Sequence, residues 1–180
     1  MTHQSAFAIW ITGLPASGKS TVAAVLAARL AGLDINVAVL ESDALRKIFP
    51  TPAAYSQLDR EYFYTSLAFI AQVLTEHGVS VIIDATANRR AYREYARSRI
   101  PRFIEVFVDC PLEICIQRDP KGIYRRAREG QANDVPGLQT EYEAPEKPDV
   151  VIRGDQDEPE QAVQQILDVL TGRDFLTHQG

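Results

Sequence analysis

Gly13-Leu14-Pro15-Ala16-Ser17-Gly18-Lys19-Ser20 is a glycine-rich segment between an apolar run and a helical pattern. It matches G-x-x-x-x-G-K-[ST], in which the glycines let the backbone turn so that successive N–H groups point at a polyphosphate. The preceding Phe7–Thr12 is typical of a buried strand, and the following Ser20–Ala31 of a helix. A plain turn between strand and helix would leave the Lys19-Ser20 ending unexplained. We therefore interpret Gly13–Ser20 as a phosphate-binding loop (P-loop) and predict that the chain binds a nucleoside triphosphate.

The overall composition restricts the classes of protein that fit. With 180 residues, 46% of them hydrophobic, the chain can bury a core, and we expect a single domain over residues 1–180. The net charge of −5 argues against a nucleic-acid binder. No signal-peptide pattern and no apolar segment of about 20 residues is seen, so no membrane partner is expected. Cys110 and Cys115 form no metal-binding or C-x-x-C pattern, which favours small core or near-surface residues and a cytoplasmic location.

Apolar runs alternate with helical patterns along the chain. The predicted strands are Phe7–Thr12, Asn36–Leu40, Ser80–Asp84, Phe103–Asp109 and Asp149–Ile152. The predicted helices are Ser20–Ala31, Asp43–Ile48, Asp59–His77, Arg89–Ser98, Leu112–Arg118, Gly122–Glu129 and Glu158–Leu170. Continuous apolarity predicts strands buried on both faces, and the alternation predicts a parallel sheet with helices on each side. The predicted fold class is therefore α/β, a three-layer sandwich of the P-loop nucleoside triphosphate hydrolase fold.

Polar residues follow the predicted strands at one edge of this sheet, where ligands of such folds bind. Besides the P-loop, these are Glu41-Ser42-Asp43, Asp84-Ala85-Thr86 and Asp109-Cys110-Pro111. Asp43 is either a base or Mg²⁺ organiser, or an N-cap of the short helix that follows. Beside a P-loop we favour the catalytic role. Asp84 stays open between a site residue and a cap or turn residue.

A basic segment suggests which kind of P-loop protein this is. The chain lacks the N-K-x-D motif of GTPases, and Asp84 ends its strand without the paired acid of motor ATPases. Residues 117–130 contain Arg118, Lys121, Arg125, Arg126 and Arg128. Such a run is either a solvated helix face or a lid that closes over phosphates and excludes water. We favour the lid and a small-molecule kinase, and expect the irregular stretch at about 130–148 to be functional or disordered.

Three ordered blocks of the chain resemble the adenylylsulfate kinase (APS kinase) family, within a resemblance from about Ile9 to about Val151. Phe103–Glu113, Arg118–Arg128 and Tyr142–Glu146 are similar to the family's FIEVFVDTPLE, RDPKGLYKKAR and YEAPE. The resemblance implies transfer of the γ-phosphate of MgATP to the 3′-hydroxyl of adenosine 5′-phosphosulfate (APS), giving PAPS and ADP in sulfate assimilation. It also implies ATP and Mg²⁺ as cofactors, a small-molecule nucleotide substrate and a possible homodimer.

The family's motifs imply a role for each matching residue. The ATP-binding residues would be Gly13, Leu14, Pro15, Ala16, Ser17, Gly18, Lys19, Ser20, Thr21 and Arg118. Lys19 and Asp43 would be catalytic, and Ser20 and Asp43 would hold the metal ion. The acceptor-binding residues would be Asp43, Arg46, Tyr55, Arg60, Thr86, Lys121 and Val135.

Several acceptor-side positions depart from the family pattern. D-G-D-N reads Glu41–Ala44, D-R-x-E-N-x-R-R reads Asp59–Ser66, and I-S-P-x-R reads Thr86–Arg90. Val135 replaces the aromatic residue of F-T-G that sandwiches the adenine. A lost buried hydrogen-bonding group and a lost stacking ring would each cost about 1–3 kcal/mol of substrate binding. Two alternatives therefore stay open: a kinase of the same fold acting on another nucleotide or small-molecule hydroxyl, and a non-catalytic nucleotide-binding module.

Overall fold

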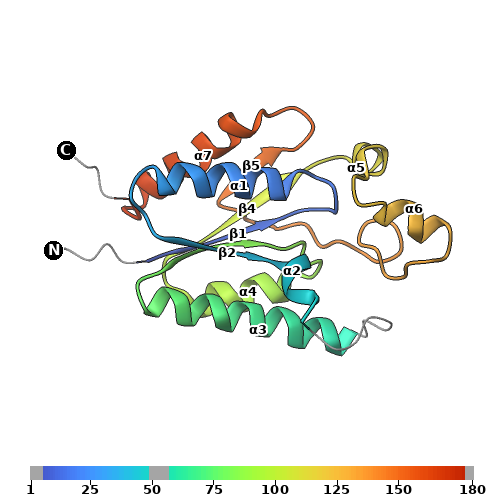
Figure 1. Cartoon of the computed structure of the whole chain (residues 1–180), viewed down its shortest axis with the longest axis horizontal. Coiled ribbons are helices and arrows are strands. Elements are labelled where there is room, and N and C mark those ends of the chain that lie inside the picture. The colour runs from blue at the N-terminus through green and yellow to red at the C-terminus, as the bar shows by residue number, and fades with distance from the viewer. Residues whose placement is uncertain (1–5, 49–56, 177–180) are drawn as a thin grey trace.

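The computed structural model describes residues 6–48 and 57–176, which form one parallel sheet between two layers of helices (Figure 1). The strands are β1 (Ala8–Thr12), β2 (Val37–Glu41), β3 (Ser80–Asp84), β4 (Phe103–Asp109) and β5 (Val150–Arg153). Their order is β2-β3-β1-β4-β5, and every neighbouring pair is parallel. The predicted α/β three-layer sandwich is confirmed.

The helices divide between the two faces of the sheet and its carboxyl edge (Figure 1). One face is covered by α1 (Lys19–Ala31) and α7 (Pro159–Gly172), and the other by α3 (Gln57–Glu76) and α4 (Arg90–Arg99). The short helices α2 (Ser42–Arg46), α5 (Leu112–Arg118) and α6 (Ile123–Arg128) lie toward the carboxyl ends of the strands. Within residues 6–48 and 57–176, no helix has the length and hydrophobicity needed to cross a membrane.

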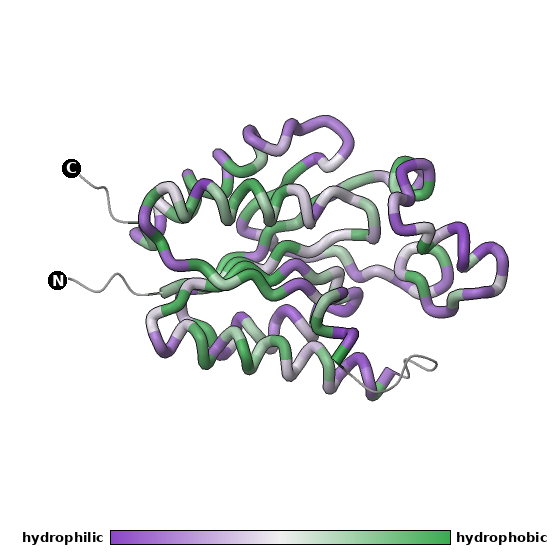
Figure 2. The backbone as a smooth tube through the Cα atoms, in the orientation of Figure 1, coloured by the Kyte–Doolittle hydropathy of each residue, from purple (hydrophilic) through white to green (hydrophobic). Residues whose placement is uncertain are grey.

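Burial separates the central strands from the edge strands. Every residue of β1 and β3 is buried, as their continuous apolar runs predict, and Figure 2 shows hydrophobic residues gathered along the strands at the centre of the molecule. The same prediction is wrong for β2, whose residues are half-buried or exposed, and for β5, where buried and exposed residues alternate. Both are edge strands with one neighbour each, so the layers cover them less completely.

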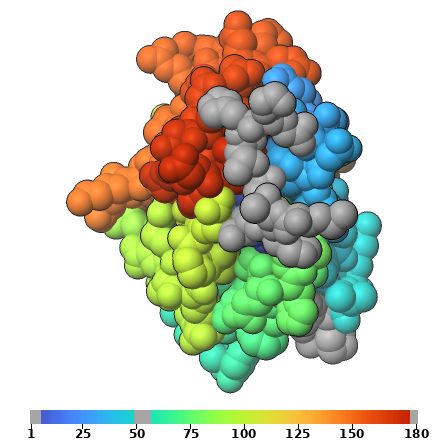
Figure 3. All heavy atoms as spheres, turned by 90° about the vertical axis from the view of Figure 1, so that its left-hand side faces the viewer, coloured from blue at the N-terminus to red at the C-terminus, as the bar shows by residue number. Residues whose placement is uncertain are grey.

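The strand alternation builds a separate core on each face of the sheet. Ile9 and Ile11 of β1 belong to the cluster beneath α1 and α7, whereas Ala8 and Trp10 belong to the cluster beneath α3 and α4. Figure 3 looks onto the end of the molecule away from α5 and α6, where α3 (green), α4 (yellow-green) and the residues after α7 (red) pack around the sheet. At this end Phe175 stacks on Phe7.

A third, smaller hydrophobic cluster lies at the carboxyl end of the sheet. It contains the free thiols Cys110 and Cys115 together with Tyr124, Ala127 and Val135, so both cysteines are core rather than near-surface residues. Partly buried Leu14 and Ala16 of the P-loop pack against it. The segment from α5 to the loop around residue 135 is therefore joined to the P-loop by apolar contacts.

The irregular stretch between α6 and β5 is fastened to α4. The backbone N–H of Arg90 donates to Glu143 Oε2 at 2.8 Å, and its side chain bonds Ala144 O and Glu146 Oε1. The buried Arg93 Nη2 donates to Glu143 O at 2.7 Å. These contacts give the Tyr142–Glu146 block a structural role: it ties the long loop to the helix that follows β3.

Candidate active site

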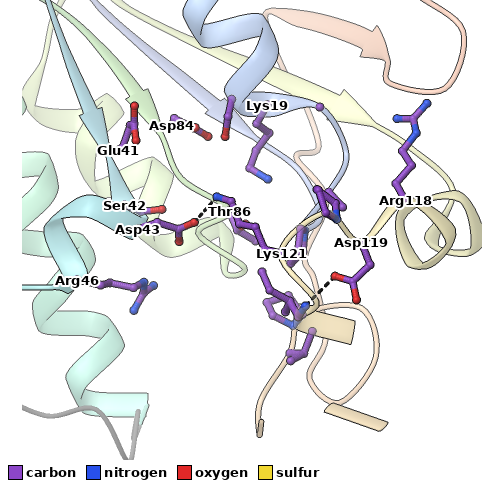
Figure 4. Close-up of a pocket in the computed structure, with 18 of the residues that line it drawn as sticks. Lys19, Glu41, Ser42, Asp43, Arg46, Asp84, Thr86, Arg118, Asp119 and Lys121 are labelled. Atoms are coloured by element: carbon purple, nitrogen blue, oxygen red, sulfur yellow. Dashed lines mark hydrogen bonds and ion pairs between the residues drawn. The ribbon is translucent and has the colours of Figure 1, made fainter. Parts of the chain in front are cut away.

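A cavity of about 560 Å³ opens at the carboxyl ends of β1, β2 and β3 (Figure 4). Because β1 lies between β3 and β4, and α1 and α4 cover opposite faces, side chains from both halves of the sheet meet here. The predicted site residues that line it are Pro15, Ala16, Gly18, Lys19, Ser20, Thr21, Asp43, Arg46, Arg60, Thr86, Arg118, Lys121 and Val135. Gly13, Leu14 and Ser17 do not line it, and Tyr55 lies outside the described residues.

The P-loop backbone forms a tight turn at one wall of the cavity. Ala16 and Gly18 both have positive φ angles, +62° and +109°, and Gly18 is the N-cap of α1. A Cβ on Gly13 would lie 2.5 Å from the carbonyl oxygen of Val108, so only glycine fits where the loop passes β4. Gly13 and the fully buried Ser17 therefore shape the loop, while Pro15, Ala16 and Gly18–Thr21 face the cavity.

Lys19 is a buried ammonium group held across the P-loop. Its Nζ donates to the carbonyl oxygen of Leu14 at 2.8 Å, and the residue is 8% exposed. Burial lowers the pKa of Lys19, and the carboxylates of Asp84 and Asp43 partly oppose this shift. A bound phosphate would add negative charge beside the Lys19 ammonium group.

Asp43 lies in the first turn of α2 and does not cap it. The N-cap position is Glu41, which makes no side-chain capping bond, so the N-cap interpretation of Asp43 is wrong. Its Oδ2 instead accepts a hydrogen bond from Lys121 Nζ at 2.6 Å. Burial raises the pKa of Asp43, but the bond and charge of Lys121, with Arg46 and Lys19, outweigh it and hold the pKa below its usual value. The group is therefore a carboxylate at neutral pH.

The turn between α5 and α6 directs Lys121 into the cavity. Asp119 accepts hydrogen bonds from the backbone N–H groups of Ile123 and Arg125, at 2.7 and 2.9 Å. Gly122 has a φ of +64° and is the N-cap of α6. The hydrogen bond to Asp43 raises the pKa of Lys121, so this cation is firmly protonated.

The cations of the basic segment divide between the cavity and the protein surface. Lys121 and Arg118 line the cavity, whereas Arg125, Arg126 and Arg128 are exposed residues of α6 outside it. Arg118 Nη1 donates to Gly154 O at 2.7 Å, which places this residue on the P-loop side of the cavity (Figure 4).

Helix α6 also contacts the outer face of the P-loop. The buried Tyr124 donates its hydroxyl to the carbonyl oxygen of Pro15 at 3.0 Å, and burial raises the pKa of this phenol. Val135 is 4% exposed and belongs to the hydrophobic cluster under α6. Val135 lines the cavity with an aliphatic side chain, which cannot stack on an adenine as an aromatic ring would.

The wall opposite the P-loop is formed by α2, α3 and the loop after β3. Arg46 stacks 4.2 Å from the ring centroid of Phe63, and its Nη2 donates to the Tyr64 hydroxyl at 3.0 Å. Arg60 Nη2 donates to Asp134 O at 2.8 Å, linking α3 to the loop after α6. The carbonyl oxygen of Thr86 accepts a 2.6 Å bond from Thr12 Oγ1.

The cavity contains residues that the sequence-predicted site omits. Asp84 lines it, is 7% exposed, and ends β3, so the cap interpretation of Asp84 is wrong because Arg89 is the N-cap of α4. Its place at a strand's carboxyl end was the signal for including it. Glu41 and Asp119 also line the cavity, as does Tyr64, which no sequence motif marked.

The donor atoms of the cavity fit a phosphate-bound Mg²⁺ ion. Ser20, Asp43 and Asp84 line the same cavity as Lys19. Among the described residues, no cluster of three His, Cys, Asp or Glu side chains is arranged to hold a metal by itself. The hydroxyl of Ser20 and the carboxylates of Asp43 and Asp84 suit Mg²⁺, which proteins commonly bind through one or two carboxylates together with substrate phosphates.

Comparison with known proteins finds adenylyl-sulfate kinases both by sequence and by structure. The family model described as Adenylylsulphate kinase matches residues 5–153. The adenylyl-sulfate kinase of Synechococcus sp. (strain JA-3-3Ab) is 40% identical over 90% of this chain and 90% of its own. That of Gloeothece citriformis (strain PCC 7424) is 38% identical over 96% of this chain and 98% of its own. The Mycobacterium tuberculosis APS kinase CysC, solved in complex with AMPPNP and APS, superposes with a TM-score of 0.85 at 34% identity, covering 93% of this chain and 98% of that one.

Proposed function

This chain belongs to the adenylylsulphate kinase family, and we propose that it transfers the γ-phosphate of MgATP to the 3′-hydroxyl of APS, giving PAPS and ADP. The resemblance inferred from the three sequence blocks is thereby confirmed. The observation that carries the proposal is the meeting of Lys19, Asp43 and Lys121 in one cavity. Lys19 would contact the donor phosphates and Asp43 the acceptor hydroxyl. Lys121 would contact the acceptor and balance the charge that develops during transfer.

The P-loop side would hold ATP. Backbone N–H groups of Gly13–Thr21 would surround the phosphates, and Lys19 would exchange its bond to Leu14 O for the β- and γ-phosphate oxygens. Arg118 would lie beside the nucleotide on the same side. Mg²⁺, held by Ser20 and Asp43, would neutralise phosphate charge when bound.

Asp43 would orient the acceptor hydroxyl and accept its proton. Its carboxylate is ionised because Lys121 and two further cations face it. The hydroxyl oxygen would attack the γ-phosphorus in line with the departing ADP oxygen, without a covalent enzyme intermediate. Residues 117–130 would act as the lid, and Lys121 would contact the acceptor nucleotide and balance the charge that develops on the transferred group.

Arg46, Arg60 and Thr86 would bind the acceptor nucleotide on the far wall. Val135 would contact the acceptor through aliphatic surface alone.

We also propose a cytoplasmic location, a requirement for Mg²⁺, a homodimer and a single domain over residues 1–180. The non-catalytic alternative is disfavoured because Lys19, Ser20 and Asp43 share one cavity.

Steady-state release of ADP tests the proposal. The purified chain with MgATP should release ADP rapidly only when APS is added, and Lys19→Ala should abolish this release. ADP release by the unaltered chain that is the same with and without APS would overturn the proposed acceptor.

A further inference from the structure

The hydroxyl of Tyr64 joins two segments on the acceptor wall of the cavity. Arg46 Nη2, from α2, donates to this oxygen at 3.0 Å, and the backbone N–H of Ala87, after β3, donates to it at 3.2 Å. One segment precedes α3 in the sequence and the other follows it, and α3 carries Tyr64. One oxygen atom therefore sets the position of α2's arginine relative to the loop after β3.

The ring that carries this hydroxyl is fixed by its neighbours. Tyr64 is 4% exposed and stacks on Tyr92 with ring centroids 4.7 Å apart. Phe63 meets it edge to face at 5.2 Å, and Trp10 lies 6.4 Å away. A ring enclosed in this way cannot move its hydroxyl without repacking the cluster beneath α3 and α4.

Two of these aromatic residues contact the Arg46 guanidinium and contribute to its orientation. Helix α2 has five residues and none of them is buried, so the helix itself gives little support to the side chain. The guanidinium is instead held by the Phe63 ring at 4.2 Å and by the Tyr64 hydroxyl. Phe63 stands where the family pattern D-R-x-E-N-x-R-R has asparagine, so an aromatic face replaces a polar group beneath Arg46.

The loop after β3 depends on Tyr64 as well. Ala87 has a φ of +42°, a conformation that non-glycine residues rarely adopt. Its N–H is held by Tyr64, and its carbonyl oxygen accepts a bond from the buried Arg93. Thr86, which lines the cavity, is the preceding residue, so its placement follows from these bonds.

We propose that Tyr64 is a positioning residue that determines acceptor affinity. Its hydroxyl fixes Arg46 and the Thr86–Ala87 backbone as one preformed surface for the acceptor nucleotide. A guanidinium held in place before binding suits an anionic oxygen of the phosphosulfate group, because less side-chain entropy is lost on binding. This inference rests on the proposed function, and it concerns the acceptor half of the cavity alone.

The test compares Tyr64→Phe with Tyr92→Phe in steady-state kinetics. Tyr64→Phe keeps the ring and removes both hydrogen bonds, so the KM for APS should rise about 10-fold while the KM for ATP changes less than about 2-fold. Tyr92→Phe alters the stacked ring of the same cluster, outside the residues that line the cavity, and should leave both KM values unchanged. Phe63→Leu, which removes the face under Arg46, should also raise the KM for APS selectively.

Three results would overturn the inference. An unchanged KM for APS in Tyr64→Phe would do so, and equal rises in both KM values would show a general loss of structure. If Tyr64→Phe does not fold, an unchanged KM for APS in Phe63→Leu would decide against it. All of these leave the proposed function standing when the unaltered chain phosphorylates APS; an unaltered chain that does not use APS would overturn both.

Discussion

Lys121 Nζ lies 2.6 Å from Asp43 Oδ2, so the turn between α5 and α6 reaches across the cavity to the end of β2 (Figure 4). Both side chains remain more than half exposed, at 57% and 58%. An ion pair this accessible to water is readily exchanged for other partners. The pair keeps Asp43 ionised and Lys121 protonated, and each side chain can exchange its partner for a substrate group.

Asp43→Ala is expected to lower kcat far more than it weakens ATP binding. Removing a base or positioning carboxylate typically costs about 10²–10⁴-fold in rate, whereas the P-loop that holds ATP is untouched. Steady-state kinetics, with ATP binding measured separately by titration, checks this. A kcat close to that of the unaltered chain would reject the catalytic role of Asp43.

Lys121→Ala is expected to raise the KM for APS about 10-fold or more, because a charge-assisted contact is lost. Arg128→Ala is the matched control, since Arg128 is an exposed cation of α6 outside the cavity. The control should behave like the unaltered chain. Equal effects of the two substitutions would indicate that the basic segment acts only through its overall charge.

The pH dependence of kcat should show the ionisation of Asp43. Its pKa lies below the usual value, so the carboxylate form, and with it activity, persists as the pH falls until that lowered pKa is reached. Burial raises the pKa of Asp43, and Lys121 is the largest of the influences that lower it. Lys121→Ala removes that influence, so the pKa of Asp43 should rise. The acidic limb of the pH–rate profile should therefore move to higher pH in this variant, and an unmoved limb would contradict the role of Lys121.

Arg93→Ala is expected to destabilise the fold by about 3–5 kcal/mol, because the buried carboxylate of Glu105 loses its short ion pair and keeps the longer contact with Arg97 at 3.4 Å. Arg93 Nε bonds Glu105 Oε1 at 2.6 Å, and the two side chains are 1% and 11% exposed. Arg99→Ala, at an exposed position of the same helix, should cost less than about 0.5 kcal/mol. Urea denaturation measures both values, and similar costs would contradict the importance of the buried pair.

The burial of the strands was predicted correctly from the sequence for the central strands β1 and β3, but not for the edge strands β2 and β5. Ser80–Asp84 and Phe103–Asp109 have the predicted bounds because their largely apolar runs end sharply at an aspartate. Burial of β2 and β5 was wrongly predicted because it depends on which strands lie at the edge, and strand order is a property of the whole chain.

The site was predictable where local motifs carry the chemistry. The P-loop and Asp43 are local patterns, and both line the cavity. The pairing of Lys121 with Asp43 joins residues 78 positions apart, so only the fold brings them together. Tyr64 was missed for the same reason, since its hydroxyl acquires its role from Arg46 and Ala87, on two other segments.

The fate of the γ-phosphate tests the central claim most directly. ATP labelled in that group is incubated with the chain, Mg²⁺ and APS, and the labelled products are identified by mass spectrometry and phosphorus NMR. The account predicts that the label appears on the 3′ oxygen of the APS ribose, in an amount equal to the ADP formed. Label found only in free phosphate, or on any other hydroxyl, would contradict it.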